Sequence, residues 1–238
     1  MKRKILNYFV MLSLVVLCGA GTSFGQPALV SPAPPPPPVD DAMAPPPPVK
    51  MVSPGVYEMG GIRIIKNENR IEFPAEVNMD KGLLEYVLVG NSGKVHESLL
   101  RTAISPYALQ ISLLLLGVEG SMKPLGEQGQ AAMPEGDRVA ILVSRQDKGA
   151  EKKVPVEQWI AGGVQPAGTM PWVFTGSTVM NGVFMAQSEK SIVALFHDPV
   201  ALIDHQLTEG ASDDIWHVDS AAVPPVGTKV TVVIEKIK

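Results

Sequence analysis

Two groups of side chains in this sequence could take part in acid–base or metal chemistry, and the first is a histidine beside a glutamate. His96 and Glu97 follow one another directly, and an imidazole near a carboxylate can act as a general base or as a metal ligand. They are the candidate catalytic residues. Adjacent residues on a helix or strand point in different directions, so the pair need not share a site. The structural alternative is a helix start, in which Glu97 complements the helix dipole and His96 is hydrogen-bonded in place.

The second group lies toward the C-terminus, where three histidines are mixed with aspartates. His197, Asp198 and His205 are the candidate metal ligands, because imidazole and carboxylate together bind zinc or manganese. The spacings of eight and twelve residues, from His197 through His205 to His217, match neither a zinc finger nor a helical zinc motif. The alternative is that these acids are solvated in loops. We therefore assign no cofactor from the sequence.

Trp172 and Trp216 are the candidate binding residues. Aromatic side chains can line a ligand groove, and both tryptophans lie in the strand-rich second half of the chain. The alternative is packing in the core or across neighbouring strands, where large aromatic side chains bury much of their surface.

The elements that must position these side chains are mostly strands. Apolar or alternating runs, most of them bounded by Gly, Pro, Asn or Asp, predict strands at residues 56–66, 70–73, 85–89, 138–144, 172–175, 183–186, 191–196 and 229–237. Pro74 is predicted to end the second of these, because proline cannot donate a ladder hydrogen bond in a central strand. Short helices are predicted at residues 96–103, 156–161 and 199–204.

One longer, leucine-rich helix has clear boundaries. Ser105 is a good N-cap, Pro106 suits the first helical position, and Gly117 supplies the C-terminal stop. The four leucines at 113–116 cover all sides of a helix, which predicts that it is buried against a sheet. Strands outnumber helices without regular alternation. The sequence therefore predicts an α+β fold, in which a strand-rich mixed or antiparallel sheet packs against this helix and a few short helices.

Residues 1–25 have the pattern of a signal peptide. A basic start precedes an apolar run at 5–17, and Ser23 and Gly25 put small residues at the positions before a cleavage site. The apolar run is shorter than the ~20 residues that span a bilayer. Leucine precedes Cys18 where a lipoprotein signal has a small residue, so lipid attachment is disfavoured. We expect an exported protein, periplasmic or extracellular, that is membrane-tethered only if the signal is not cleaved.

A proline-rich segment at residues 26–54 separates the signal from a predicted globular domain at 55–238. Proline runs at 34–38 and 45–48 favour an extended, solvated polyproline II conformation. The segment is therefore predicted to be a disordered spacer. The functional alternative is a ligand for an aromatic-lined groove on a partner.

Charge and cysteine content narrow the classes of function. Without the three basic residues of the signal, 17 Lys and Arg stand against 24 Asp and Glu, a formal charge of −7. A nucleic-acid partner is disfavoured, because such binders carry a basic surplus or patch. The only cysteine is Cys18. The mature chain would thus hold neither disulfides nor cysteine-ligated zinc or iron–sulfur clusters, and no stable membrane span is expected in it.

Six segments together resemble the YdjY domain family. They are residues 71–79, 94–100, 172–177, 198–203, 213–216 and 224–228. The resemblance covers nearly all of residues 55–238 and implies an exported bacterial protein without an established activity. Some relatives are labelled ferredoxin-type, which implies cysteine-bound iron and sulfur, and a mature chain without cysteine cannot inherit that label.

The sequence favours an exported cell-envelope domain that acts as a binding or interaction module. Its partner would be an envelope protein or another envelope ligand. The alternative is a metal-dependent or hydrolytic enzyme built around His96 and Glu97.

Overall fold

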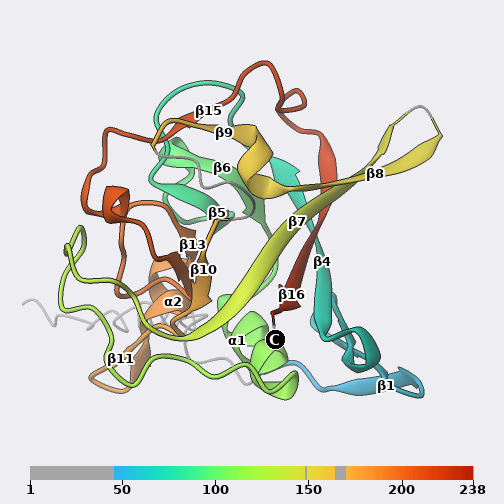
Figure 1. Ribbon diagram of the computed structural model, residues 1–238. Coiled ribbons are helices and arrows are strands. Elements are labelled where there is room, and N and C mark those ends of the chain that lie inside the picture. Colours follow the sequence, from blue (N-terminus) through green and yellow to red (C-terminus); the bar gives the residue numbers. More distant parts are fainter. Residues whose placement is uncertain (1–45, 148, 164–169, 238) are drawn as a thin grey trace, which may run out of the picture. The chain divides into compact units, whose positions relative to one another are not determined.

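The computed structural model describes residues 46–147, 149–163 and 170–237 (Figure 1). The predicted signal peptide, residues 1–25, lies outside the described residues, as does the predicted spacer up to residue 45. Within the described ranges no helix combines the length and apolar character that a membrane crossing requires.

Eight strands form a closed, mixed barrel. Starting from β4, the order around the barrel is β4, β16, β7, β10, β14, β13, β5, β6 and back to β4. Their bounds are β4 (Arg70–Val77), β5 (Tyr86–Gly90), β6 (Ser98–Thr102), β7 (Asp137–Asp147), β10 (Trp172–Phe174), β13 (Ser191–Ala194), β14 (Ile203–His205) and β16 (Lys229–Lys236). The pairs β5–β6 and β13–β14 are parallel and the others antiparallel. Closure removes the exposed edges that an open sheet would leave.

The main core fills the barrel. In β4 every second residue, from Ile71 to Val77, is buried, which is the period expected of a strand with one face inward. Strands β5 and β13 are instead buried at every position, because both of their faces are covered. On their outer face Tyr86, Val89 and Ala194 form a second, small apolar cluster with residues 95 and 201.

The remaining elements extend the barrel or cover it. Strands β1 (Lys50–Ser53), β2 (Val56–Met59) and β3 (Ile62–Ile65) pair antiparallel in this order, and β3 joins them to β4. Strand β8 (Ala150–Pro155) forms a long hairpin with β7 (Figure 1). Two small ladders pair β9 (Ile160–Ala161) with β15 (His217–Val218), and β11 (Val179–Met180) with β12 (Val183–Phe184). Single 3₁₀ turns occupy Lys66–Glu68, Val95–Glu97, Val156–Trp159 and Thr208–Ala211.

Helix α1 (Pro106–Leu115) has the predicted boundaries. The Ser105 side chain accepts a hydrogen bond from Ala108 N, and Pro106 is the first helical residue. At the other end Gly117 has φ +75°, and the amide of Val118 donates to Leu113 O at 3.1 Å, which is a Schellman ending. The predicted burial on all sides is wrong. Residues 114 and 115 are 49% and 38% exposed, because only one side of the helix meets the barrel. The second helix, α2 (Met185–Glu189), was not predicted.

The prediction that Pro74 ends its strand is wrong, because β4 continues through it to Val77. On the side away from β16, β3 stops pairing with β4 at Glu72, and β6 starts only at Glu76. Pro74 lies in this gap, where its missing N–H leaves no ladder bond unmade. Its carbonyl instead accepts a hydrogen bond of 2.7 Å from Thr102 Oγ1.

Two predicted helices do not form. Beyond the single turn at Val95–Glu97, residues 98–102 form β6, and the end of the segment predicted at 199–204 belongs to β14. Both strands pair with neighbours distant in the sequence, and this tertiary pairing overrides local preference. The predicted strand at 56–66 is two strands, because Gly60 and Gly61 turn the chain with φ of +56° and +86°. Ordered structure also begins before residue 55, since β1 lies within the predicted spacer.

Candidate functional site

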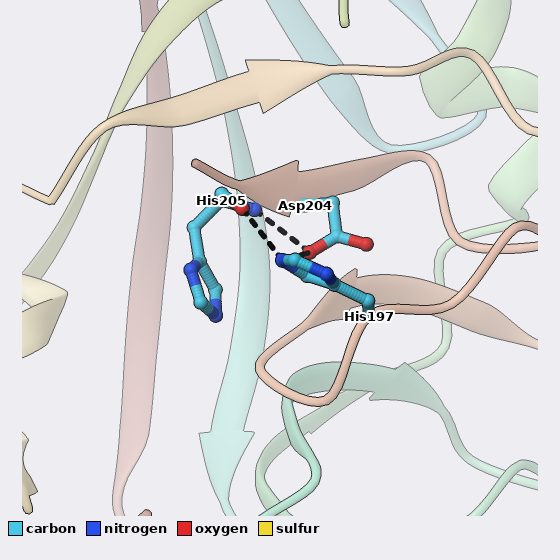
Figure 2. A group of neighbouring side chains, drawn as sticks. All are labelled: His197, Asp204 and His205. Carbon is cyan, nitrogen blue, oxygen red and sulfur yellow. Dashed lines mark hydrogen bonds and ion pairs between the residues drawn. The ribbon is translucent and has the colours of Figure 1, made fainter. Parts of the chain in front are cut away.

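Four polar residues gather at the short connection between the parallel strands β13 and β14. We call His197, Asp198, Asp204 and His205 the crossover cluster; all four are buried. Figure 2 shows that the His197 ring lies close to Asp204 and to the backbone of His205. A parallel pair is usually joined by a longer crossover containing a helix. Here the chain returns directly, and its buried backbone groups need hydrogen-bond partners that side chains must supply.

His205 is held as one neutral tautomer. Its Nε2 donates to Leu195 O at 2.7 Å, and its Nδ1 accepts from Leu207 N at 3.2 Å. Burial lowers the pKa of His205 to about 4, which outweighs the effect of the Leu195 carbonyl. The ring also lies edge-on to Trp172 and Trp216, with centroid separations of 5.7 and 5.6 Å. His205 is therefore fixed in place and uncharged.

His197 and Asp204 are equally committed to the backbone. The two ring nitrogens of His197 face Gln130 O at 2.9 Å and His205 O at 3.0 Å, so only the imidazolium form can donate to both. Asp204 accepts from Asp198 N at 3.0 Å and from His205 N at 2.8 Å. Burial raises the pKa of Asp204 well above its usual range, and the two amide donors oppose this shift. The nearest contact between Asp204 and His197 Nε2 is 3.9 Å.

The crossover cluster has the residue types of a metal site, but its ligand atoms are already hydrogen-bonded to the backbone. Possible ligand atoms of His197, Asp204 and His205 lie within 4.8 Å of one another, and all three side chains are fully buried. Each ring nitrogen and each carboxylate oxygen already contacts a backbone group, so a cation would have to break those contacts. These side chains are therefore better explained as hydrogen-bond partners of the buried backbone in the β13–β14 connection than as ligands of a metal ion.

Asp198, the third predicted metal ligand, turns toward a different group. Its carboxylate accepts from Val200 N at 3.0 Å and from Tyr86 Oη at 2.7 Å. The Tyr86 hydroxyl in turn accepts from Lys94 Nζ at 2.5 Å and from Gln128 Nε2 at 3.2 Å. Burial, then the nearby Asp198 charge, raises the pKa of Tyr86, so the phenol stays protonated. These bonds tie the loop at Gln128 to β5 and leave no free nucleophile.

His96 and Glu97 contact each other but remain apart from the crossover cluster. They lie on the 3₁₀ turn Val95–Glu97, with His96 Nε2 3.3 Å from Glu97 Oε2. The His96 side chain is 76% exposed, whereas His197 and His205 are fully buried. Burial and then the Glu97 charge raise the pKa of the nearby Glu85 carboxyl. The arrangement is a surface histidine in contact with Glu97, and neither residue lines the two pockets described below or a third beside Asp198.

The candidate binding residues Trp172 and Trp216 lie in the core, and neither lines any of the three best-formed pockets of the described residues. The metal ligands predicted from the sequence include His197 and His205 but leave out Asp204, one of the aspartates of the same stretch, which directly precedes His205 on β14. That Asp204 and His205 are adjacent can be read from the sequence. Their shared role depends on the β13–β14 connection, which no local sequence pattern indicates.

The surface of the domain has an accessible groove beside the stretch of β4 that has no strand partner on one side. Nothing in the sequence indicated this groove. Two pockets of about 380 and 460 Å³ share Asn91, Thr102 and Ala103, and we call them together the β4–β6 groove. The first pocket lies between Pro46 and Pro47, the start of α1 and the end of α2. The second lies along residues 74–76 of β4. The groove exists because no strand covers β4 between its pairings with β3 and β6.

The groove carries a positive charge in an acidic chain. Glu76 binds both Arg101 and Lys229, and these hydrogen bonds lower the pKa of its carboxyl. Lys190 lines the first pocket, and its ammonium makes no hydrogen bond or ion pair with the described residues. The two pockets are thus lined by three cations and one carboxylate, whereas the whole chain has a net charge of −4. Such a surface can hold a polar or anionic segment.

The start of α1 does not add free donors to this groove. The Gln187 side-chain oxygen accepts from Ser105 Oγ at 2.9 Å and from Tyr107 N at 3.2 Å, and Ala108 N is capped by Ser105. The first-turn amides are therefore satisfied by the protein itself.

Comparison with known proteins identifies the family of this chain. The family model of the YdjY domain matches residues 62–235, from β3 to the end of the barrel. No curated protein and no solved structure gives a match.

Proposed function

The chain belongs to the YdjY domain family, and we propose that it is an exported binding module of the cell envelope whose binding surface is the β4–β6 groove. Its export is inferred from the signal-like residues 1–25 and the proline-rich segment after them. No nucleic-acid partner is expected of an acidic chain.

One contrast carries this proposal. The side chains best suited to acid–base or metal chemistry, in the crossover cluster, are occupied by backbone contacts. The accessible groove is lined instead by amides, hydroxyls, apolar walls and cations. A surface of that kind can recognise a ligand, but it offers no nucleophile activated by a base.

A bulky substitution at the junction of the two pockets tests the proposal. Ala103 is exposed there, so Ala103→Arg blocks the groove without disturbing the core. The matched control is Ala150→Arg, on the exposed strand β8. With envelope fractions as the source, we expect wild type and control to retain the same partner, and Ala103→Arg to bind it about tenfold more weakly, which is about 1.4 kcal/mol. Equal retention by Ala103→Arg, or no partner held by the wild type, would overturn the proposal.

A second candidate function, hydrolysis at His96 and Glu97, is favoured by their 3.3 Å contact and by the raised pKa of Glu85. It predicts turnover of simple esters or envelope glycans that His96→Ala abolishes. The matched control is His217→Ala, which removes another exposed histidine. Absence of turnover, together with no metal bound to the purified protein, would exclude this candidate.

A further inference from the structure

We propose that the β4–β6 groove binds an extended acidic peptide segment of a partner protein. One acidic side chain of the peptide lies at Lys190, and a second, about four residues along the peptide, lies at Arg101 and Lys229. This inference rests on the proposed function, because it names the kind of partner that the same surface fits.

The first observation is a positive charge at the end of the groove formed by β4, β6 and β16. Arg101 and Lys229 stand on either side of Glu76, in the register that pairs β6 and β16 with β4. The side chain of Glu76 is 17% exposed, whereas those of Arg101 and Lys229 are 42% and 80% exposed. The carboxylate therefore lies beneath the two cations, and a ligand meets a net positive surface there.

Lys190 supplies a second positive charge at the other end of the groove. It is half-buried in the wall of the first pocket, and its ammonium has no partner among the described residues. Glu189, beside it on the chain, lines neither pocket, so Glu76 is the only acid among the residues that line the two pockets. Because Lys190 is partly removed from water and unpaired, an anionic ligand group gains more from it than from a fully exposed lysine.

The backbone register sets the distance between these two ends. The amide of Gly90 donates to Lys190 O at 2.8 Å, which places Lys190 beside the end of β5. The amide of Asn91 donates to Thr102 O at 2.9 Å, and β6 pairs in turn with β4. Three strand-to-strand steps of about 4.8 Å, from the chain just before β13 through β5 and β6 to β4, give about 14 Å. An extended peptide covers this distance in about four residues, and side chains four apart lie on one face of it.

The middle of the groove offers main-chain groups to such a peptide. Ala103, at the junction of the two pockets, is exposed, and neither its amide nor its carbonyl has a hydrogen-bond partner among the described residues. Asn91 and Ser92 add exposed side-chain donors and acceptors in the first pocket. These groups can pair with the N–H and C=O groups of an extended chain, as in peptides that lie along the edge of a sheet.

The apolar wall of the first pocket favours a peptide over an acidic polysaccharide. Pro47, Ile104 and Tyr107 form this wall, and Phe184 supports the Tyr107 ring at a centroid distance of 5.7 Å. An apolar side chain of a peptide can be buried against it, which adds to the two ion pairs. A polysaccharide covered with hydroxyl groups has less apolar surface to bury there.

Fluorescence anisotropy with the full chain and synthetic peptides tests the inference. The probe is a fluorescein-labelled peptide of alanine and threonine that carries two glutamates four residues apart. We expect saturable binding that weakens about tenfold when both glutamates are replaced by glutamine, as for the loss of two exposed ion pairs. A probe with its glutamates two residues apart should bind about two- to fivefold more weakly, because only one of them reaches a cation at a time.

Two substitutions in the protein locate the peptide. Lys190→Gln and Lys229→Gln should each weaken binding of the probe about two- to fivefold, as for a single exposed ion pair. The matched control for the first is Lys152→Gln, on the exposed strand β8. The matched control for the second is Lys153→Gln, because Lys153 binds Glu235 as Lys229 binds Glu76. Both controls should leave the affinity unchanged.

Equal affinity for the glutamate and glutamine peptides, or binding that is indifferent to Lys190→Gln and Lys229→Gln, would contradict the inference. Tighter binding of a polyuronate, weakened by the same two substitutions, would assign the groove to an acidic polysaccharide and contradict it as well. The two proposals fail separately. If Ala103→Arg releases the envelope partner and the probe does not bind, this inference alone is wrong. If the probe binds at the groove and the envelope partner is indifferent to Ala103→Arg, the proposed function is wrong.

Discussion

The crossover cluster and the β4–β6 groove solve opposite problems of backbone pairing. At the crossover the chain reverses inside the protein, and four polar side chains are consumed in satisfying its amides and carbonyls. At the groove β4 lacks a strand partner near the surface, and only Thr102 covers its carbonyl. In this protein the residues capable of acid–base or metal chemistry lie in the buried crossover cluster and have a structural role. The accessible surface is instead the groove where β4 lacks a strand partner.

The largest expected effect is a loss of stability when a carboxylate of the crossover cluster is removed. Asp204→Ala leaves the amides of Asp198 and His205 without acceptors in a fully buried place. We expect the free energy of unfolding to fall by about 3–5 kcal/mol. Urea titration measures it, with the exposed Asp80→Ala as control, for which a change within about 0.5 kcal/mol is expected.

A loss below about 1 kcal/mol for Asp204→Ala would mean that the cluster is not structural. Its residues would then be available for a ligand or a metal ion.

The second effect is a pH dependence that belongs to His205. Its pKa is about 4 in the folded protein against 6.5 in the unfolded chain. A histidine with a lowered folded pKa contributes stability above pH 6.5 and loses it as the pH falls toward 4, because only the unfolded state takes up the proton. We expect the stability advantage of wild type over His205→Gln to shrink by about 3 kcal/mol over this range.

The comparison with His205→Gln is needed because the raised pKa of Asp204 acts in the opposite sense on the whole protein. Urea titrations of both proteins at several pH values measure the difference. An advantage that stays constant from pH 7 to 4 would contradict the neutral, buried assignment of His205.

A third, smaller effect tests the groove side. Thr102→Val removes the hydroxyl that donates to Pro74 O and accepts from Ile104 N at 3.1 Å. We expect a loss of about 1–2 kcal/mol, because Pro74 O and Ile104 N each lose a partner, and the bond to Ile104 N is buried. The matched control, Thr208→Val, changes an exposed threonine and should be nearly neutral. Equal effects would mean that the gap in β4 is not held by Thr102.

The sequence predicted what depends on neighbouring residues. The ends of α1 follow from Ser105, Pro106 and Gly117, and β16 was predicted to within one residue. Barrel closure depends on the β4–β6 pairing, which joins Glu76 to Arg101 across the fold, and no local pattern encodes it. For the same reason neither the structural role of Asp204 nor the groove was predicted, because both follow from the pairing of strands distant in the sequence.

The smallest effect concerns Lys190, where stability and binding are expected to move in opposite directions. Glycine adopts a φ of +59° without strain, and lysine does so at a cost of about 1–2 kcal/mol. The substitution Lys190→Gly relieves this strain, and part of the stability gained is offset by the greater conformational freedom of glycine in the unfolded chain. Lys190→Gly should therefore stabilise the protein by about 0.5 kcal/mol, measured by urea titration, while it removes the groove cation that has no partner among the described residues. Lys190→Asn, which also tolerates this conformation, separates the two contributions, since it relieves part of the strain and removes the same charge. A destabilised Lys190→Gly would show that the lysine stem over Gly90 and Gly93 is held by packing, and the strain would then carry no functional meaning.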